Sequence, residues 1–222
     1  MVSGAIRIGV IGVGFGAKVQ IPAFISEGFE VTAVCSRQKE RAENAAQNLN
    51  IPNAYTDYRK MLEQNDLNAV SIVAPPNLHH EITIAALDAG KHVLCEKPFA
   101  KNQTEAKEML EKGVETGLTT MVAHEFRFAP ARAYVKALLE EGYIGDLQNA
   151  SMSMFMRGGP PGGRGPGLDW RQFYEYGGGQ LGGLGSHYID CLRDWFGEIK
   201  SITGGVFENG DLVSNSEDKA DD

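Results

Sequence analysis

Short apolar runs alternate with helix-like segments through the first 123 residues, and this alternation restricts the fold more than any other feature. Each run is continuously apolar, as in strands buried on both faces of a parallel sheet. Helix-like segments such as 39–49 and 79–90 separate the runs. This order predicts an α/β fold with a doubly wound parallel sheet over residues 1–123. The runs that predict strands are 6–12, 29–36, 69–75, 92–97 and 119–124, with a shorter one at 54–57.

The pattern changes after residue 123, and residues 124–222 are expected to begin a second domain of α+β type. Two strands cannot cover a helix and also protect their own edges, so this sheet domain is expected to be incomplete. Either the chain is part of a longer protein, or a partner supplies the remaining strands. The expected elements are helices at 130–142 and 180–197, strands at 147–157 and 200–210, and a glycine- and proline-rich loop at 158–169.

The composition limits the classes of function that the chain can serve. The chain has 222 residues, of which 42% are hydrophobic and 23% charged, and its net charge is −8. These values are typical of a soluble globular protein. A nucleic-acid-binding protein would show a basic stripe, and no apolar run approaches the roughly 18 residues of a membrane helix. We therefore expect neither a nucleic acid nor a membrane as a partner.

The cysteines and histidines indicate a compartment and the absence of a metal site. Cys35, Cys95 and Cys191 lie far apart, without the spacing of a disulfide pair or a metal site. The N-terminus does not resemble a secretion signal. Both features predict a cytoplasmic protein with reduced thiols. His79 and His80 are adjacent, which is poor geometry for chelation, so no metal is expected.

The segment GVIGVGFGAKV follows the first expected strand and opens the first expected helix. Gly12, Gly14 and Ala17 fit the pattern G-x-G-x-x-A, which is typical of a loop that binds the pyrophosphate of a dinucleotide. The first glycine permits a tight turn, the second lets the backbone approach the phosphates, and the small third residue lets the helix pack on the strand. The N–H groups at the helix start then face the phosphates. We predict a Rossmann dinucleotide site that also includes Phe15 and Gly16.

The same loop fits a second pattern, G-x-G-x-G, which resembles S-adenosylmethionine-dependent methyltransferases. Both classes usually carry an acid at the end of the second strand, where it holds the ribose hydroxyls. This chain has Ser36 and Arg37 there, a hydroxyl and a guanidinium that suit the 2′-phosphate of NADP. We favour NADP as the cofactor, and NAD remains the alternative.

Two further segments follow the carboxyl ends of expected strands, where ligands of open parallel sheets bind. Pro75 lies after the run at 69–75, and Glu96, Lys97 and Pro98 end the run at 92–97. Both segments are therefore expected to line the cofactor cleft.

Four stretches of the chain resemble the Gfo/Idh/MocA family, which includes glucose–fructose oxidoreductase and inositol dehydrogenase. They occur in the order that the family shows, and AGKHVLCEKP is the most specific match. The resemblance covers nearly the whole chain and implies a nicotinamide-dependent oxidoreductase that acts on a sugar or a polyol. The four stretches are GVIGVGFGA, AVSIVAPPNLHHEITIAALDAGKHVLCEKPFA, VAHEFRFAPA and GGGQLGGLGSHYID.

The resemblance also implies roles for individual residues. Lys97 would point to the substrate hydroxyl, where an ammonium stabilises a developing alkoxide. His187 would be the general acid/base, since an imidazole titrates near neutral pH. The family further implies a cis peptide before Pro98 and a place for His79 in the cofactor cleft. For His79 the alternative is a histidine that only begins a helix.

Three more residues are candidates for binding the substrate. Asp190 lies three residues after His187 and is expected either to orient the imidazole, to bind substrate or to be a surface carboxylate. Arg127 and Trp170, together with Glu125, have the hydrogen-bonding groups and the stacking face that a polyhydroxylated substrate requires. A salt bridge at the domain junction and a core tryptophan are the alternative roles.

One position departs from the family pattern. Many relatives carry an aspartate four residues before the histidine, and this chain has Gly183 there. Lys97 and His187 would then act without a third group, so a non-catalytic NAD(P)-binding protein is the alternative function. A short-chain dehydrogenase is disfavoured because the chain contains no Tyr-x-x-x-Lys. In the family the second domain commonly builds the oligomer interface, which implies a homo-oligomer.

Overall fold

The structure of the protein is a computed structural model that describes residues 4–154, 176–179, 181–205, 207–208 and 211–212. Trp170 and the loop at 158–169 lie outside the described residues. The contacts within the chain form two compact units, Met1–Ala123 and His124–Asp222.

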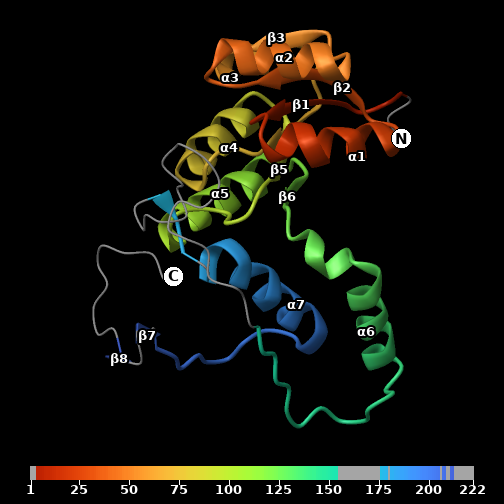
Figure 1. Ribbon diagram of the computed structural model, residues 1–222, viewed down its shortest axis with the longest axis vertical. Coiled ribbons are helices and arrows are strands. Elements are labelled where there is room, and N and C mark those ends of the chain that lie inside the picture. Colours follow the sequence, from red (N-terminus) through yellow and green to blue (C-terminus); the bar gives the residue numbers. More distant parts are fainter. Residues whose placement is uncertain (1–3, 155–175, 180, 206, 209–210, 213–222) are drawn as a thin grey trace. The chain divides into compact units, whose positions relative to one another are not determined.

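The first unit is built on one parallel sheet of six strands (Figure 1). Their order is β3-β2-β1-β4-β5-β6, and each neighbouring pair is parallel. The order reverses between β1 and β4, which leaves a crevice at their carboxyl ends. The predicted doubly wound sheet is confirmed. The strands are β1 (Arg7–Ile11), β2 (Glu30–Cys35), β3 (Asn53–Tyr55), β4 (Ala69–Ile72), β5 (His92–Cys95) and β6 (Thr120–Val122).

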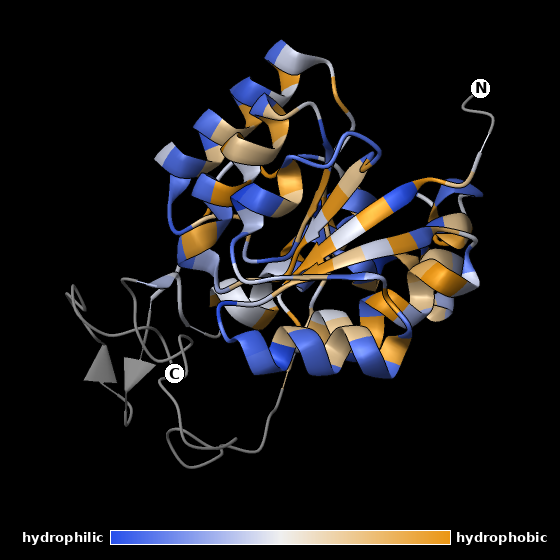
Figure 2. Ribbon diagram, turned by 90° about the horizontal axis from the view of Figure 1, so that it is seen from above, coloured by the Kyte–Doolittle hydropathy of each residue, from blue (hydrophilic) through white to orange (hydrophobic). Residues whose placement is uncertain are grey.

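Helices cover both faces of this sheet (Figure 2). One buried cluster joins the strands to α3, α4 and α5, and a second cluster joins them to α1 and α2. Pro22 lies in the first turn of α1, a position that proline commonly occupies in helices. The helices are α1 (Ile21–Ser26), α2 (Lys39–Leu49), α3 (Tyr58–Leu62), α4 (His79–Asp88) and α5 (Gln103–Thr116).

The continuous apolarity of the strands follows from these two cores. Neighbouring residues of a strand point to opposite faces of the sheet. In β2, Val34 belongs to one buried cluster, while Ala33 and Cys35 belong to the other. Both faces therefore require apolar side chains, which is the pattern expected of a parallel sheet.

The second unit is mainly helical in the residues that the structure describes. The helices expected at 130–142 and 180–197 are confirmed, although the second begins with a π-helical turn. The strand β7 (Phe207–Glu208) pairs with β8 (Asp211–Leu212) in an antiparallel ladder. The helical elements are η3 (Glu125–Phe128), α6 (Pro130–Glu140), the π-helix η6 (Leu181–Gly185) and α7 (Ser186–Phe196).

Of the two strands predicted in this unit, the one at 147–157 is wrong over its described residues, and the one at 200–210 is confirmed only at 207–208. Residues 147–154 form no strand, and all of them are exposed. Residues 200–205 form no strand either, and β7 has only two residues. A strand needs a neighbouring strand to pair its backbone groups, and the described part of the chain provides none for these segments.

The helices of the described segments are short compared with a membrane span. None of the helices there combines the length and the apolarity that a crossing requires.

Candidate functional site

The turn after β1 depends on three glycines, each for a different physical reason. Gly12 has a φ of +112°, and a Cβ built on it would lie 2.4 Å from the carbonyl oxygen of Val73, so only glycine fits. A Cβ on Gly16 would lie 2.8 Å from Cγ1 of Val10, so the first helical turn packs directly on β1. A Cβ on Gly14 would meet nothing within 4 Å. Gly14 therefore borders open space that a ligand group can enter.

The closest approach of helix to strand is at Gly16, while Ala17, the residue expected to provide this packing, packs against the same core cluster as β1. Gly16 is buried, whereas Ala17 is only half-buried. The reason is the π-helix η1 (Gly16–Gln20), which begins at Gly16 and brings that residue against β1. Phe15 lies between the two glycines and is 46% exposed, so its side chain is directed to the surface.

A pocket of about 410 Å³ opens beside this turn, at the carboxyl ends of β1, β2 and β4. Five of the predicted cofactor residues line it together, namely Gly12, Gly14, Ser36, Arg37 and Pro75. They are far apart in the sequence and meet because parallel strands end at the same edge of the sheet. The structure adds a group of lining residues that the sequence did not single out, comprising Gln38, Arg41, Thr56, Tyr58, Leu78, Glu81 and Ile82.

Both positively and negatively charged side chains line this pocket. Arg37 and Arg41 line it, and among the described residues neither side chain forms an ion pair. Glu81 also lines it, but the hydroxyl of Tyr58 donates to Glu81 Oε1 at 2.6 Å, and Arg59 donates to the same oxygen. The hydrogen bond from Tyr58 and that from Arg59 lower the pKa of Glu81. The acid of this pocket is thus already engaged by its neighbours, and the two arginines remain to meet an anion.

The Glu96–Lys97–Pro98 segment follows β5 as a turn with a cis peptide between Lys97 and Pro98, as the family resemblance implied. Lys97 is half-buried, and Glu96 is only 7% exposed. Gln20 Nε2 donates to Glu96 Oε1 at 2.7 Å, and the backbone N–H of Lys97 donates to Glu96 Oε2 at 3.2 Å. Glu96 was expected to contact the cofactor, but these contacts turn its carboxylate toward the protein interior.

His79 was also expected in the cofactor cleft, and the structure places its ring behind the cleft. The imidazole is 1% exposed and is not among the residues that line the pocket. Nε2 lies 2.7 Å from the carbonyl oxygen of Ala74, and Nδ1 lies 2.9 Å from that of Pro98. The ring therefore connects the loop after β4 to the turn that carries Lys97. Burial is the main cause that lowers the pKa of His79 below its ordinary value of 6.5.

His187 lies on α7 in the second unit and is 1% exposed. Its ring stacks on Phe126, with centroids 3.9 Å apart and planes 11° from parallel. The carboxylate nearest to it in the described residues comes from η3, where Glu125 Oε1 lies 3.9 Å from His187 Nε2. A Cβ at Gly183 would meet nothing within 4 Å. Glu125 thus brings an acid to the histidine from another element, which sequence spacing along the helix did not reveal.

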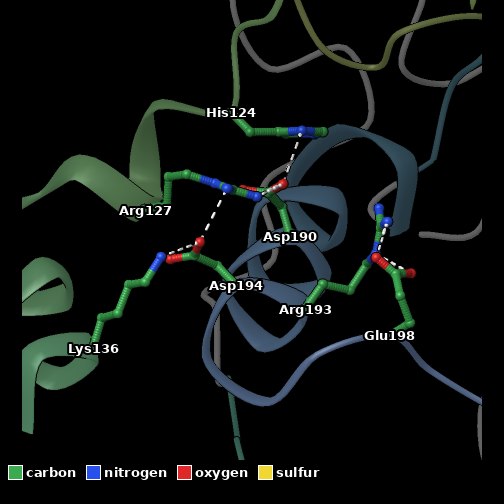
Figure 3. Close-up of polar contacts among 7 residues, drawn as sticks. All are labelled: His124, Arg127, Lys136, Asp190, Arg193, Asp194 and Glu198. Carbon is green, nitrogen blue, oxygen red and sulfur yellow. Dashed lines mark hydrogen bonds and ion pairs between the residues drawn. The ribbon is translucent and has the colours of Figure 1, made fainter. Parts of the chain in front are cut away.

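Asp190 and Arg127 bind each other (Figure 3). Arg127 donates from Nε at 2.7 Å and from a terminal nitrogen at 2.5 Å to the two oxygens of Asp190. These hydrogen bonds raise the pKa of Arg127. The imidazole that faces Asp190 is that of His124, with Nδ1 3.6 Å from Oδ1, and the histidine expected there was His187. Both candidates for substrate binding therefore have partners in the protein, which favours the salt-bridge alternative.

A second acid on the same face of α7 completes this polar network (Figure 3). Asp194 accepts from Arg127 at 3.1 Å and from Lys136 of α6 at 2.8 Å. Arg127 thus joins η3 to two successive turns of α7, and Lys136 adds α6 to the same cluster. Across the described residues, no group of three or more His, Cys, Asp and Glu side chains is arranged to hold a metal ion.

The fold and the phosphate turn define an α/β protein of the dinucleotide-binding class. Comparison with family models then identifies the family. The model of the oxidoreductase family with an NAD-binding Rossmann fold matches residues 6–124, and the Gfo/Idh/MocA C-terminal domain matches residues 133–221. The chain belongs to the Gfo/Idh/MocA family. The S-adenosylmethionine alternative is set aside on this match.

Several curated proteins are similar to the chain over most of its length. Levoglucosan dehydrogenase of Pseudarthrobacter phenanthrenivorans is 33% identical over 207 residues, which are 89% of this chain and 53% of that protein. Trans-1,2-dihydrobenzene-1,2-diol dehydrogenase of Mus musculus is 32% identical over 225 residues, which are 95% of this chain and 64% of that protein. An uncharacterized oxidoreductase of Synechocystis sp. is 32% identical over 202 residues, 90% of this chain and 54% of that protein. The chain spans about half the length of the first and third of these relatives.

Solved structures of the family have the same fold. Levoglucosan dehydrogenase in complex with NADH and levoglucosan has a TM-score of 0.72 and 32% identity, over 87% of this chain and 54% of that chain. A 3-ketoreductase from Actinomadura kijaniata in complex with TDP-benzene and NADP has a TM-score of 0.58 and 34% identity, over 63% of this chain and 44% of that chain. Proteins of this fold thus bind either nicotinamide dinucleotide.

Replacing His79 by glutamine should reduce the loss of stability on acidification. Below about pH 6.5 the unfolded chain binds a proton at His79 that the folded chain resists, so the free energy of unfolding falls as the pH falls. One such proton contributes at most about 1.4 kcal/mol per pH unit. Urea unfolding at pH 7.5 and 5.5 measures this loss, and the variant should lose less stability than the wild type.

His80→Gln is the matched control, because His80 is the next residue and its ring faces Glu108 at the surface. This control keeps His79 and should retain the larger loss. An equal loss in the wild type and in His79→Gln would contradict the account.

Proposed function

We propose that the chain is the cofactor-binding part of an NADP(H)-preferring oxidoreductase. It would transfer hydride between the nicotinamide and a hydroxyl or keto carbon of a sugar or polyol-like substrate. The observation that carries the proposal is the 410 Å³ pocket at the phosphate turn, beside the open space at Gly14. A relative that is 32% identical forms a complex with NADH and levoglucosan, which supports both the cofactor class and the substrate class.

The dinucleotide fits the residues that are present. Gly14 leaves room for a pyrophosphate, and the free N–H groups at the start of η1 follow directly. Ser36, Arg37 and Arg41 line the far part of the same pocket and would meet the ribose and its 2′-phosphate. A guanidinium binds phosphate through two parallel hydrogen bonds, which favours NADP over NAD. The engagement of Glu81 by Tyr58 and Arg59 supports the same preference.

When bound, the nicotinamide accepts or supplies the hydride. In our proposal the Lys97 ammonium hydrogen-bonds the substrate oxygen and stabilises the alkoxide that develops on it. His187 takes up the proton of that hydroxyl, or returns it in the reverse direction. The buried contacts of Glu96 and His79 support the turn that carries Lys97, so they fix the backbone from which the ammonium extends.

A non-catalytic NAD(P)-binding protein is the second candidate. It is favoured by Gly183, which stands where many relatives have an acid, and by the 1% exposure of His187. The two candidates differ in turnover and agree in cofactor binding.

We also propose that the protein forms a homo-oligomer through its second unit. Large apolar side chains are exposed there, including Tyr134 at 65%, Tyr143 at 75% and Ile202 at 80%. Exposed apolar side chains favour association where they gather into one patch.

Replacing Gly14 by alanine should weaken NADPH binding without unfolding the protein. The new methyl group meets no protein atom within 4 Å, but it enters the space that we assign to the pyrophosphate. We expect at least a tenfold loss of affinity, or about 1.4 kcal/mol, while the stability changes by less than about 0.5 kcal/mol. Fluorescence titration and thermal unfolding measure the two quantities.

Gly204→Ala is the matched control, because a Cβ there also meets nothing within 4 Å and Gly204 does not line the pocket. It should leave both quantities unchanged. Unaltered NADPH binding in Gly14→Ala would contradict the assignment of the pyrophosphate to this turn.

Replacing Lys97 by alanine should lower turnover by about 10²- to 10⁴-fold, because the alkoxide loses its hydrogen-bond donor. NADPH binding should stay within about twofold, since binding of the dinucleotide is assigned to other residues. A panel of sugars and polyols that includes levoglucosan, with absorbance of NADPH as the readout, measures turnover. Lys107→Ala is the control, because this side chain is 71% exposed. Full turnover in Lys97→Ala would refute the catalytic role.

A further inference from the structure

Gln20 is a buried amide that connects three separate segments of the first unit. It is 9% exposed and is the last residue of the π-helix η1. Its Oε1 accepts a hydrogen bond from the Ser71 hydroxyl of β4 at 2.5 Å, and its Nε2 donates to Glu96 Oε1 at 2.7 Å. The side chain thus joins the helix after the phosphate turn to the central strand and to the turn after β5.

The π-helix determines where Gln20 points. In this turn the N–H of Ile21 donates to the carbonyl oxygen of Gly16, five residues earlier. Such wide turns are rare and occur frequently at functional sites. Gly16, at the other end of the turn, is pressed against Val10 of β1. The phosphate turn and Gln20 are therefore the two ends of one short, tightly packed element.

Glu96 connects the Gln20 amide to the backbone of Lys97 through hydrogen bonds. One carboxylate oxygen accepts from Gln20, and the other accepts from the N–H of Lys97 at 3.2 Å. A carboxylate that is 7% exposed needs hydrogen-bond donors to stay in place, so removing the Gln20 amide changes where Glu96 rests. The N–H of Lys97 is bound to the same carboxylate and would follow it.

We propose that Gln20 is a positioning residue for Lys97. Through its hydrogen bond to Glu96, it fixes the turn that carries Lys97 relative to the helix that follows the phosphate turn. The inference rests on the proposed function only in so far as Lys97 is catalytic. The His79 ring is hydrogen-bonded to the carbonyl oxygen of Pro98, on the other side of the same turn. It is also hydrogen-bonded to the carbonyl oxygen of Ala74, in the loop after β4. Both loops that border the cofactor pocket thus hold the Lys97 turn.

The amide of Lys97 reports this link directly, and no turnover is needed to observe it. The full chain is labelled with ¹⁵N-lysine, and the Lys97 amide signal is assigned by its loss in Lys97→Arg. In Gln20→Leu the Lys97 amide proton should move upfield by at least about 0.3 ppm, because its hydrogen bond to Glu96 weakens. The other lysine amides should stay in place, which a general loss of stability would not produce.

The response to cofactor is the second readout. In the wild type, saturation with NADPH should shift the Lys97 amide, and in Gln20→Leu this shift should fall by at least half. The affinity for NADPH should stay within about threefold. Val19→Ala is the matched control, since Val19 belongs to the same π-helical turn and is 47% exposed. It should behave as the wild type.

Ser71→Ala keeps the test decisive if Gln20→Leu does not fold. This change removes only the hydroxyl that holds Gln20 and should move the Lys97 amide in the same direction by a smaller amount. A wild-type Lys97 signal in the folded variants would overturn the proposal. A wild type that binds no NADPH would refute the proposed function, and the signal of the cofactor-free chain would still decide the role of Gln20.

Discussion

The close approach of the backbone at Gly12 to the carbonyl of Val73 is the constraint on which the rest of the site depends. A Cβ in that position would lie 2.4 Å from the oxygen, so the turn after β1 exists only with glycine. The turn lies between β1 and β4, where the order of the sheet reverses and a crevice opens. The phosphate turn, Ser36 and Arg37 after β2, and Pro75 after β4 meet around it.

Several acids at or near the candidate sites are paired with other side chains in the structure. Asp190 is bound by Arg127, Glu81 by Tyr58, and Glu96 by Gln20. Asp190 and Glu96 are buried, and a buried charge needs such a partner, whereas Glu81 is paired at a half-exposed position. This pairing shifts the expected ligand contacts toward cationic groups. In the pocket of the first unit these are Arg37 and Arg41.

The sequence was sufficient for the parallel sheet, because continuous apolarity has a single physical cause there, namely burial on both faces. The glycine turn was also predictable, since Gly12 and Gly16 stand where the backbone packs too closely for a Cβ. Contacts between distant elements were not predictable. Glu125 reaches His187 from η3, and Arg41 reaches the pocket from the first turn of α2. Neither spacing follows a motif. The strand expected at 147–157 was not predictable for a similar reason. Its described residues, 147–154, form no strand, because strand formation depends on a pairing partner and not on the segment alone.

The measurement that tests the account most directly is a fluorescence titration of the purified chain with NADPH and with NADH. The pocket at the phosphate turn and the arginines beside it predict saturable binding of both, with NADPH bound more tightly. Tighter binding of NADH would keep the dinucleotide site and overturn the preference for NADP. Saturable binding of neither would contradict the central claim that this turn holds a nicotinamide dinucleotide.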